Sequence, residues 1–212
     1  MRRDDWLIRR FLKPIAWLAC LGPTAWIVAG LVRGDLGADP VKTMTHTTGL
    51  SALIILFLTL AVTPVRRLTG WTPVVRLRRL LGLFAFYHAL VHFLIYSVFD
   101  HRLSVDEISA DIAKHPWVLV GFAAFVILSI LAATSPAAAI RRIGGKRWQR
   151  LHRLVYLAAA LGVLHFFWLV KKDTSEPLTY GAILAIILGV RLLPRIRQPA
   201  PQKRVVAGQS AS

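Results

Sequence analysis

The sequence predicts an all-α membrane protein, a bundle of six transmembrane helices with both termini in the cytoplasm. Of its 212 residues, 56% are hydrophobic and only 17% are charged, whereas a soluble domain carries about 25% charged residues. Mean hydropathy is +0.56. Six apolar segments are long enough to cross a bilayer as helices. Lysine and arginine gather in every second connection between these segments, which is the pattern of cytoplasmic loops.

Residues 1–13 form a basic, partly amphipathic lead-in on the cytoplasmic side, in which Trp6, Leu7 and Phe11 can contact membrane lipid at the interface. The apolar run that follows is long for a signal peptide and has no convincing small-x-small cleavage site. We therefore interpret it as a retained first span. Pro23 predicts a kink within that span.

The predicted spans cover residues 14–32, 46–64, 80–99, 117–134, 151–170 and 178–193. The connection 100–116 carries four acidic residues and is expected to contain a short surface helix. This organisation predicts one six-helix domain over 14–193, followed by a polar, proline-containing cytoplasmic tail at 194–212 that is expected to be disordered.

The distribution of charge predicts the orientation of the bundle. The connections and termini assigned to the cytoplasm hold 21 of the 27 Lys and Arg residues, with only Asp4 and Asp5 as acids. The opposite side holds the other 6 basic residues and 8 acidic ones. Because the basic residues lie in short clusters between apolar runs, the net charge of +17 is topogenic, and we expect no nucleic-acid partner.

Two histidines lie at matching depth in different predicted spans. His92 is twelve residues into the third span and His165 is fourteen residues into the fifth, which places them roughly 18 and 21 Å from the cytoplasmic face. One imidazole on each side of a flat ring is what a bis-histidine haem requires. The alternative is that both are polar groups that hydrogen-bond across the bundle.

His152 lies thirteen residues before His165, so the two are about 20 Å apart along the helix axis and about 140° apart around it. The two side chains therefore cannot both point at one site. His152 is therefore a ligand of a second, inner haem, a contact to another cofactor on the inner side, or an interfacial histidine.

The other four histidines are weaker candidates for haem ligands. His88 lies one turn before His92 on the same helix face and is an alternative ligand or a hydrogen-bond partner. His46, at the outer mouth of the second span, either lines the route out of the membrane or is interfacial. His101 and His115 belong to the acidic connection, where we expect solvated side chains.

The sequence lacks the residues that several other functions require. The single cysteine, Cys20, excludes a disulfide framework and a cysteine-ligated cluster. GGKRWQ lacks the spacing of a P-loop, and neither GxGxxG nor HExxH occurs. No acid falls inside a predicted span, which argues against a proton-driven transporter.

Three stretches together resemble a known family: GDLGADPVK with His46 following, RLRRLLGL leading to His92, and GGKRWQRLHRLVYL with His152 and His165. They are similar to the MsrQ (YedZ) family, the haem-containing membrane subunit of the MsrPQ protein-methionine-sulfoxide reductase system, within the ferric-reductase-like transmembrane group. The resemblance covers almost the whole membrane region. It implies a multi-pass protein of the bacterial inner membrane.

The resemblance also implies cofactors and partners. It implies haem b, one or two per chain, with His92, His152 and His165 as the haem-associated histidines, and it implies FMN. A separate periplasmic molybdopterin-containing reductase would form a heterodimer with the chain and carry the catalysis. Electrons would come from the quinone pool.

The sequence adds an expectation about how electrons enter. The chain ends nineteen residues past Leu193, too short a stretch for the flavin and nicotinamide domain that follows the last span in ferric reductases. We therefore expect quinol or a separate flavin reductase as donor, and docking of the partner on the acidic connection 100–116. Basic residues on the inner side can bind FMN phosphate or haem propionates, or they are topogenic charge: Arg76, Arg78, Arg79, Lys146, Arg147 and Arg150, with Trp148 beside them.

Two alternatives stay open. The chain can be a stand-alone cytochrome b-type reductase of metals or quinones, or a non-redox transporter or assembly subunit whose histidines are structural. A bound haem chromophore is expected for the reductase and not for the transporter or assembly subunit.

Overall fold

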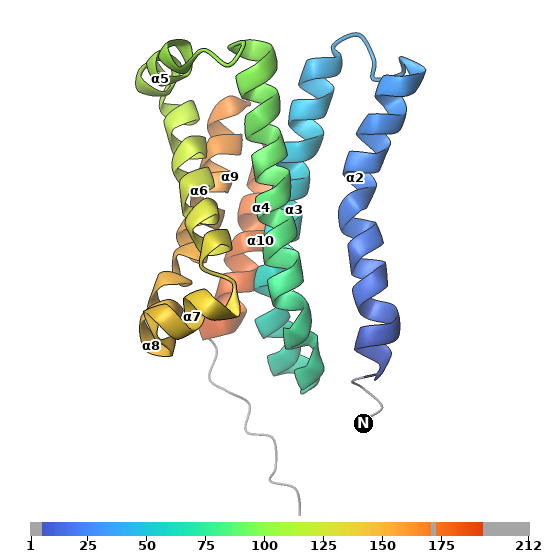
Figure 1. Cartoon of the computed structure of the whole chain (residues 1–212), viewed down its shortest axis with the longest axis vertical. Helices are drawn as coiled ribbons and strands as arrows, with labels where there is room; N and C mark the ends of the chain where they lie inside the picture. The colour runs from blue at the N-terminus through green and yellow to red at the C-terminus, as the bar shows by residue number, and fades with distance from the viewer. Residues whose placement is uncertain (1–5, 171–172, 193–212) are drawn as a thin grey trace, which may run out of the picture.

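The computed structural model describes residues 6–170 and 173–192, and every regular element within them is helical (Figure 1). The first five residues of the predicted lead-in and the predicted tail lie outside the described residues. The long helices are α2 (Lys13–Arg33), α3 (Pro40–Thr69), α4 (Arg78–Ile95), α6 (Pro116–Ala133), α9 (Leu154–Leu169) and α10 (Ser175–Leu192). The short ones are η1 (Ile8–Leu12), η2 (Thr72–Leu77), η3 (Tyr96–Asp100), α5 (Val105–Lys114), α7 (Ala137–Ile143) and α8 (Gly145–Leu151).

Five helical segments are long and apolar enough to cross a membrane, so the chain is a multi-pass membrane protein. They are Ile8–Arg33, Pro40–Thr69, Thr72–Asp100, Pro116–Ala133 and Gly145–Leu169. The first three contain the predicted spans 14–32, 46–64 and 80–99, and the last two end one residue before the predicted spans 117–134 and 151–170. α10 forms where the sixth span is predicted, but it is not among the five.

Local sequence sets the ends of the helices. α3 begins before the predicted span because Asp39 caps it, accepting a hydrogen bond from the backbone N–H of Lys42 at 3.0 Å, with Pro40 in the first turn. Gly34 and Gly70 end α2 and α3 with φ of 67° and 71°, a conformation that glycine adopts without strain. α2 continues as a helix through Pro23.

The connection after α4 contains the expected short helix. Helix α4 passes into the π-helical turn η3, and a tight bend follows in which Arg102 and Leu103 take positive φ values of 48° and 62°. Ser104 then caps α5 by accepting a hydrogen bond from the N–H of Glu107 at 3.3 Å. This bend returns the chain across one end of the bundle before α6 begins (Figure 1).

Helix α3 lies at the centre of the bundle. It packs most extensively on α4, while α6 packs on α9, and the core is formed by apolar residues of α3, α4, α6, α9 and α10. Parallel aromatic rings join α4 to α6, with the ring centroids of Phe93 and Phe125 4.7 Å apart. In Figure 1, α5 covers one end of this bundle, and α7 and α8 lie at the other.

Candidate functional site

A cavity of about 720 Å³ lies between α3, α4, α6 and α9, at the end of the bundle that α5 covers. Its walls are mostly apolar, with phenylalanine, leucine, alanine and glycine side chains. Five histidines line it: His46, His92, His101, His115 and His165. An apolar cavity with a few converging polar groups is the usual form of a cofactor site.

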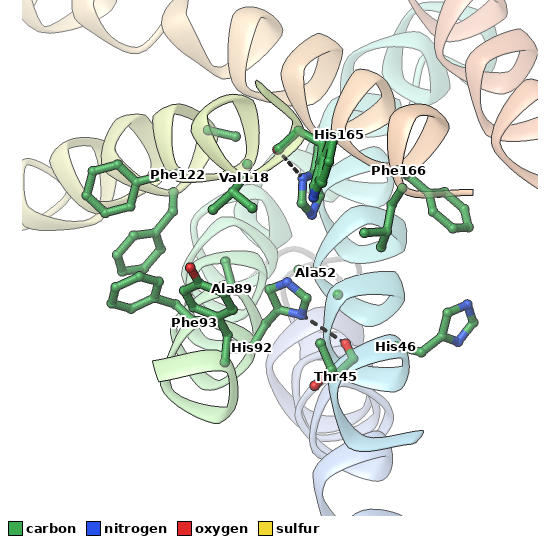
Figure 2. A pocket seen from close by; sticks show the side chains of 18 of the residues that line it. Thr45, His46, Ala52, Ala89, His92, Phe93, Val118, Phe122, His165 and Phe166 are labelled. Atoms are coloured by element: carbon green, nitrogen blue, oxygen red, sulfur yellow. Dashed lines mark hydrogen bonds between the residues drawn. The ribbon is translucent and has the colours of Figure 1, made fainter. Parts of the chain in front are cut away.

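His92 and His165 enter this cavity from α4 and α9 (Figure 2). Nδ1 of His92 lies 2.9 Å from the carbonyl oxygen of Thr45 on α3. Nδ1 of His165 lies 2.7 Å from the carbonyl oxygen of Trp117 on α6. A carbonyl only accepts, so each Nδ1 carries the proton and donates it. Each Nε2 is then left with a lone pair, which is the arrangement of metal-binding histidines.

The two imidazoles are spaced as ligands of one metal. Their ring centroids are 6.3 Å apart and their planes are inclined by 85°. A metal-bound imidazole nitrogen lies about 2.0 Å from the metal and about 1.1 Å from its ring centroid, so two rings on opposite sides of one metal have centroids about 6.2 Å apart. The observed separation fits two ligands on opposite sides of a metal, and the cavity around them offers space for a flat macrocycle.

His152 occupies a different environment from His165. It follows α8, and its Nε2 lies 3.1 Å from Oγ1 of Thr134. The indole of Trp148 stacks on its ring at 4.0 Å between centroids, and that indole N–H donates to the carbonyl of Thr134 at 2.8 Å. His152 does not line the cavity. The expected separation of His152 from His165 is therefore found, and the haem role of His152 stays a prediction.

His88 and His46 also differ in their surroundings. His88 is fully buried, its Nε2 is 2.7 Å from the carbonyl oxygen of Cys20 on α2, and it does not line the cavity. Its Nδ1 makes no hydrogen bond within the part of the chain that the structure describes. His46 lines the cavity and meets Phe166 edge to face, with centroids 6.2 Å apart.

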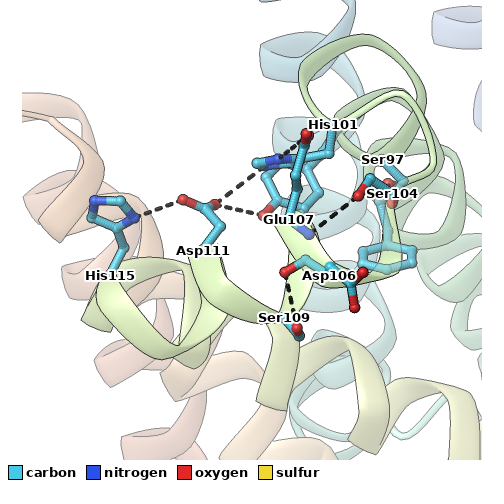
Figure 3. Close-up of polar contacts among 10 residues, drawn as sticks. Ser97, His101, Ser104, Asp106, Glu107, Ser109, Asp111 and His115 are labelled. Atoms are coloured by element: carbon cyan, nitrogen blue, oxygen red, sulfur yellow. Dashed lines mark hydrogen bonds and ion pairs between the residues drawn. The ribbon is translucent and has the colours of Figure 1, made fainter.

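A polar network that was not expected from the sequence lines the cavity beneath α5, at what we call the cavity mouth (Figure 3). Asp111 of α5 accepts a hydrogen bond from the hydroxyl of Tyr96 at 2.6 Å and lies 2.7 Å from Nδ1 of His115. It also lies 3.4 Å from Nε2 of His101. Burial raises the pKa of Asp111, but the hydrogen bonds from Tyr96 and His115 outweigh it, so the pKa lies below its ordinary value. His101 and His115 are therefore both held by a carboxylate. Solvated side chains were expected, and this holds for His115, which is 40% exposed, but not for His101, which is 16% exposed.

The end of the bundle opposite α5 carries a cluster of arginines around Tyr156. Arg191 of α10 donates to the hydroxyl of Tyr156 and to the carbonyl of Leu60, and Arg67 donates to the carbonyl of Arg191. Arg78 donates to the hydroxyl of Thr63. Within residues 6–170 and 173–192, no ion pair joins Arg67, Arg78 or Arg191 to a carboxylate. Only Arg78 of this cluster was a candidate from the sequence.

The other basic candidates lie on separate elements. Arg76 lies on η2 and Arg79 in the first turn of α4. Lys146, Arg147 and Arg150 are exposed on α8, and Trp148 from the same helix stacks on His152. The structure therefore divides the basic candidates into one group at the start of α4 and another on α8.

The fold and the paired imidazoles define a class, that of multi-pass helical membrane proteins related to ferric reductases. A family model described as "Ferric reductase like transmembrane component" matches residues 44–163. The chain belongs, within this class, to the MsrQ family. It is 46% identical over 192 residues to the "Protein-methionine-sulfoxide reductase heme-binding subunit MsrQ" of Polaromonas naphthalenivorans, covering 90% of this chain and 88% of that protein. The protein of the same name from Rhodospirillum rubrum is 48% identical over 182 residues, 86% of this chain and 88% of that protein.

Proposed function

We propose that the chain is the haem-binding electron-transfer subunit of a protein-methionine-sulfoxide reductase system, with His92 and His165 as the axial ligands of a b-type haem. The observation that carries the proposal is the convergence of the two imidazoles at 6.3 Å between centroids, each with Nδ1 held by a backbone carbonyl. The names of the relatives, which describe heme-binding subunits, support it.

A haem in this cavity supplies a one-electron redox centre in the outer half of the membrane. The chain's own residues hold and shield that centre. The carbonyls of Thr45 and Trp117 keep both ligands in the tautomer that presents Nε2, and the apolar walls exclude water. No acid–base chemistry is required of the chain itself, because reduction of the sulfoxide takes place on a separate subunit.

We assign one haem to the His92 and His165 pair. A second haem on His152 would require its Nε2 to leave the hydroxyl of Thr134 and its ring to lose the stacked indole of Trp148. His152 fits better as a contact beside a flavin on the inner side.

We place the phosphate of FMN at the arginine cluster of Arg67, Arg78 and Arg191. Three guanidinium groups without a carboxylate partner among the described residues favour an anion there. The group on α8, Lys146, Arg147 and Arg150, is the alternative position for the phosphate, and a haem propionate is the alternative anion.

The same proposal includes an orientation. α10 completes six spans in the bacterial inner membrane, and both termini lie in the cytoplasm because the arginine-rich end of the bundle faces inward. Electrons enter on the inner side from quinol or a flavin reductase. They leave at the acidic outer end, where α5 covers the cavity and a periplasmic molybdopterin-containing reductase docks to form the heterodimer.

The test is the optical spectrum of protein purified from haem-replete cells. Dithionite is expected to give the sharp bands of a reduced low-spin b-type haem, and His92→Ala is expected to abolish them. His115→Ala changes another histidine of the same cavity and should leave the bands in place. A colourless wild-type preparation, or a His92→Ala variant with an unchanged spectrum, contradicts the assignment.

The remaining question is whether the chain reduces a substrate without a partner. Reduction of ferric salts or quinones by the purified chain, at the same rate with and without a periplasmic reductase, would identify a stand-alone reductase.

A further inference from the structure

Each proposed haem ligand packs in the same way on a neighbouring helix. A backbone carbonyl accepts a hydrogen bond from Nδ1 of the ligand, and a glycine follows four residues later; we call this arrangement a seat. His92 of α4 donates to the carbonyl of Thr45, and four residues further along α3 lies Gly49. His165 of α9 donates to the carbonyl of Trp117, and four residues further along α6 lies Gly121. The two seats therefore share one pattern, a carbonyl at position i and a glycine at i+4, although they belong to different helices.

The glycines are in close contact with the rings. A methyl group added at Gly121 would lie 2.6 Å from Nδ1 and 2.8 Å from Cε1 of His165. A methyl group added at Gly49 would lie 3.0 Å from both Nδ1 and Cε1 of His92. These approaches are shorter than van der Waals contact between carbon atoms, which is about 3.5–4.0 Å. A side chain at position 121 would therefore displace the imidazole, and one at position 49 would require it to move by a few tenths of an ångström.

Helix geometry explains the spacing of four. The carbonyl at i already accepts the N–H of residue i+4 within the helix. A side chain at i+4 leans toward the helix N-terminus and covers the turn that contains this carbonyl. At Thr45 and Trp117, the absence of a side chain at i+4 leaves room for the imidazole ring to lie against this turn and donate to the carbonyl from Nδ1.

His88 provides an internal comparison. It also bonds to a helix carbonyl, that of Cys20 at 2.7 Å, but the residue four positions on is Thr24, whose hydroxyl meets the hydroxyl of Tyr87 at 3.3 Å. His88 uses Nε2 for this bond, so its Nδ1 is the remaining nitrogen, and that atom is buried away from the cavity. At the carbonyl of Cys20, where residue i+4 is not glycine, the imidazole is therefore bonded through Nε2 and not through Nδ1.

We infer that Gly49 and Gly121 are positioning residues: they let Nδ1 of each proposed haem ligand reach its carbonyl, and they thereby set the planes of the two rings. This inference rests on the proposed assignment of His92 and His165. The seats hold the planes 85° apart. Nearly perpendicular axial imidazoles leave two iron d orbitals close in energy, and this produces a strongly anisotropic low-spin EPR signal. The wild-type ferric protein is expected to show such a signal.

The experiment compares alanine variants of the full chain by EPR and by redox titration of the purified protein. Gly121→Ala is expected to shift the largest g value and the midpoint potential, and Gly49→Ala is expected to shift both by less because its contacts are longer. Gly82→Ala and Gly189→Ala are matched controls. A methyl group at 82 meets only Thr59 at 3.7 Å, and one at 189 meets nothing within 4 Å. Both controls should match wild type.

The possible outcomes distinguish a failure of the positioning role of the glycines from a failure of the haem-ligand assignment. If His92→Ala and His165→Ala lose the low-spin haem and Gly121→Ala shifts the EPR signal while Gly82→Ala does not, the seats are established. If the histidine variants lose the haem but both Gly121→Ala and Gly49→Ala behave as their controls, the positioning role is overturned and the ligand assignment stands. If the histidine variants keep their haem, the ligand assignment itself fails. If the Gly121→Ala protein does not accumulate in cells, the comparison of Gly49→Ala with Gly82→Ala tests the positioning role instead.

Discussion

The two ends of this bundle use histidine differently. At the end that α5 covers, His165 has its Nδ1 on a backbone carbonyl and its Nε2 turned into a cavity that it shares with His92. Toward the opposite end, on the same stretch of chain, His152 has its Nε2 on the hydroxyl of Thr134 and an indole on its ring face. Whether Nε2 of a membrane histidine is available to a metal therefore depends on which ring nitrogen is already hydrogen-bonded to a neighbouring group.

The ends also differ in charge. The cavity mouth carries Asp111, His101 and His115 in one network, whereas the opposite end carries Arg67, Arg78 and Arg191 around a tyrosine. The proposed function places the haem at the first end and the anionic flavin at the second. The following changes test this contrast, from the largest expected effect to the smallest.

Replacing the two histidines of the fifth span gives the sharpest contrast. His165→Ala is expected to lower the haem content per chain by at least about tenfold, because it removes an axial ligand and not merely a supporting contact. His152→Ala is expected to keep the low-spin haem. Pyridine haemochrome analysis against protein concentration measures both. Equal loss of haem in the two variants would mean that His152 is also a ligand.

The arginine cluster is tested by the flavin content. Arg78→Ala and Arg191→Met each remove a charge-assisted donor, and each is expected to weaken FMN retention by about tenfold. Fluorescence of flavin released from a known amount of protein is the measurement. Arg147→Ala on α8 serves as the comparison. Loss of flavin in Arg147→Ala alone would move the phosphate site to α8.

His88 separates a structural histidine from a ligand. His88→Ala leaves a cavity at a fully buried position and removes the hydrogen bond that joins α4 to α2. Its expected cost is about 2–4 kcal/mol of stability, with the haem spectrum unchanged. Thermal unfolding in detergent, followed by circular dichroism, tests the first part. A changed haem spectrum in the folded variant would indicate that His88 contacts the haem.

The smallest effect is expected at the cavity mouth. The pKa of Asp111 in the folded protein is lowered, so its contribution to stability is fully present above the ordinary carboxyl pKa and is lost as the pH falls through the folded value. The attachment of α5 is therefore expected to weaken only in strong acid, below about pH 4. Amide hydrogen exchange in α5, corrected for the intrinsic rate, measures this change.

Asp111→Asn is the control for that experiment. An amide cannot titrate, so the acid-dependent loosening of α5 should disappear, although Tyr96, His101 and His115 remain in place. Loosening of α5 by about the same amount in wild type and in Asp111→Asn would assign the effect to another group.

The sequence alone determined the helices and the pair of histidines. Apolar runs of spanning length specify their own helices because a backbone in lipid must satisfy its hydrogen bonds internally. The first five predicted spans coincide with the observed segments to within one residue at their C-terminal ends or lie inside them. Capping residues such as Asp39 lengthened α3 beyond its apolar run. Counting along two helices was enough to place His92 and His165 at one depth, because the rise per residue is constant.

Only the tertiary structure decided which nitrogen each histidine presents, and to what. The carbonyls of Thr45 and Trp117 lie 47 and 48 residues from the rings that they orient, and Asp111 meets Tyr96 only because the bend after η3 returns the chain across the bundle. Glycines at 49 and 121 are visible in the sequence as isolated glycines in apolar helices, but nothing local indicates what approaches them. Contacts of this kind depend on how helices pack side by side, and periodicity along one helix does not encode the rotation of its neighbour.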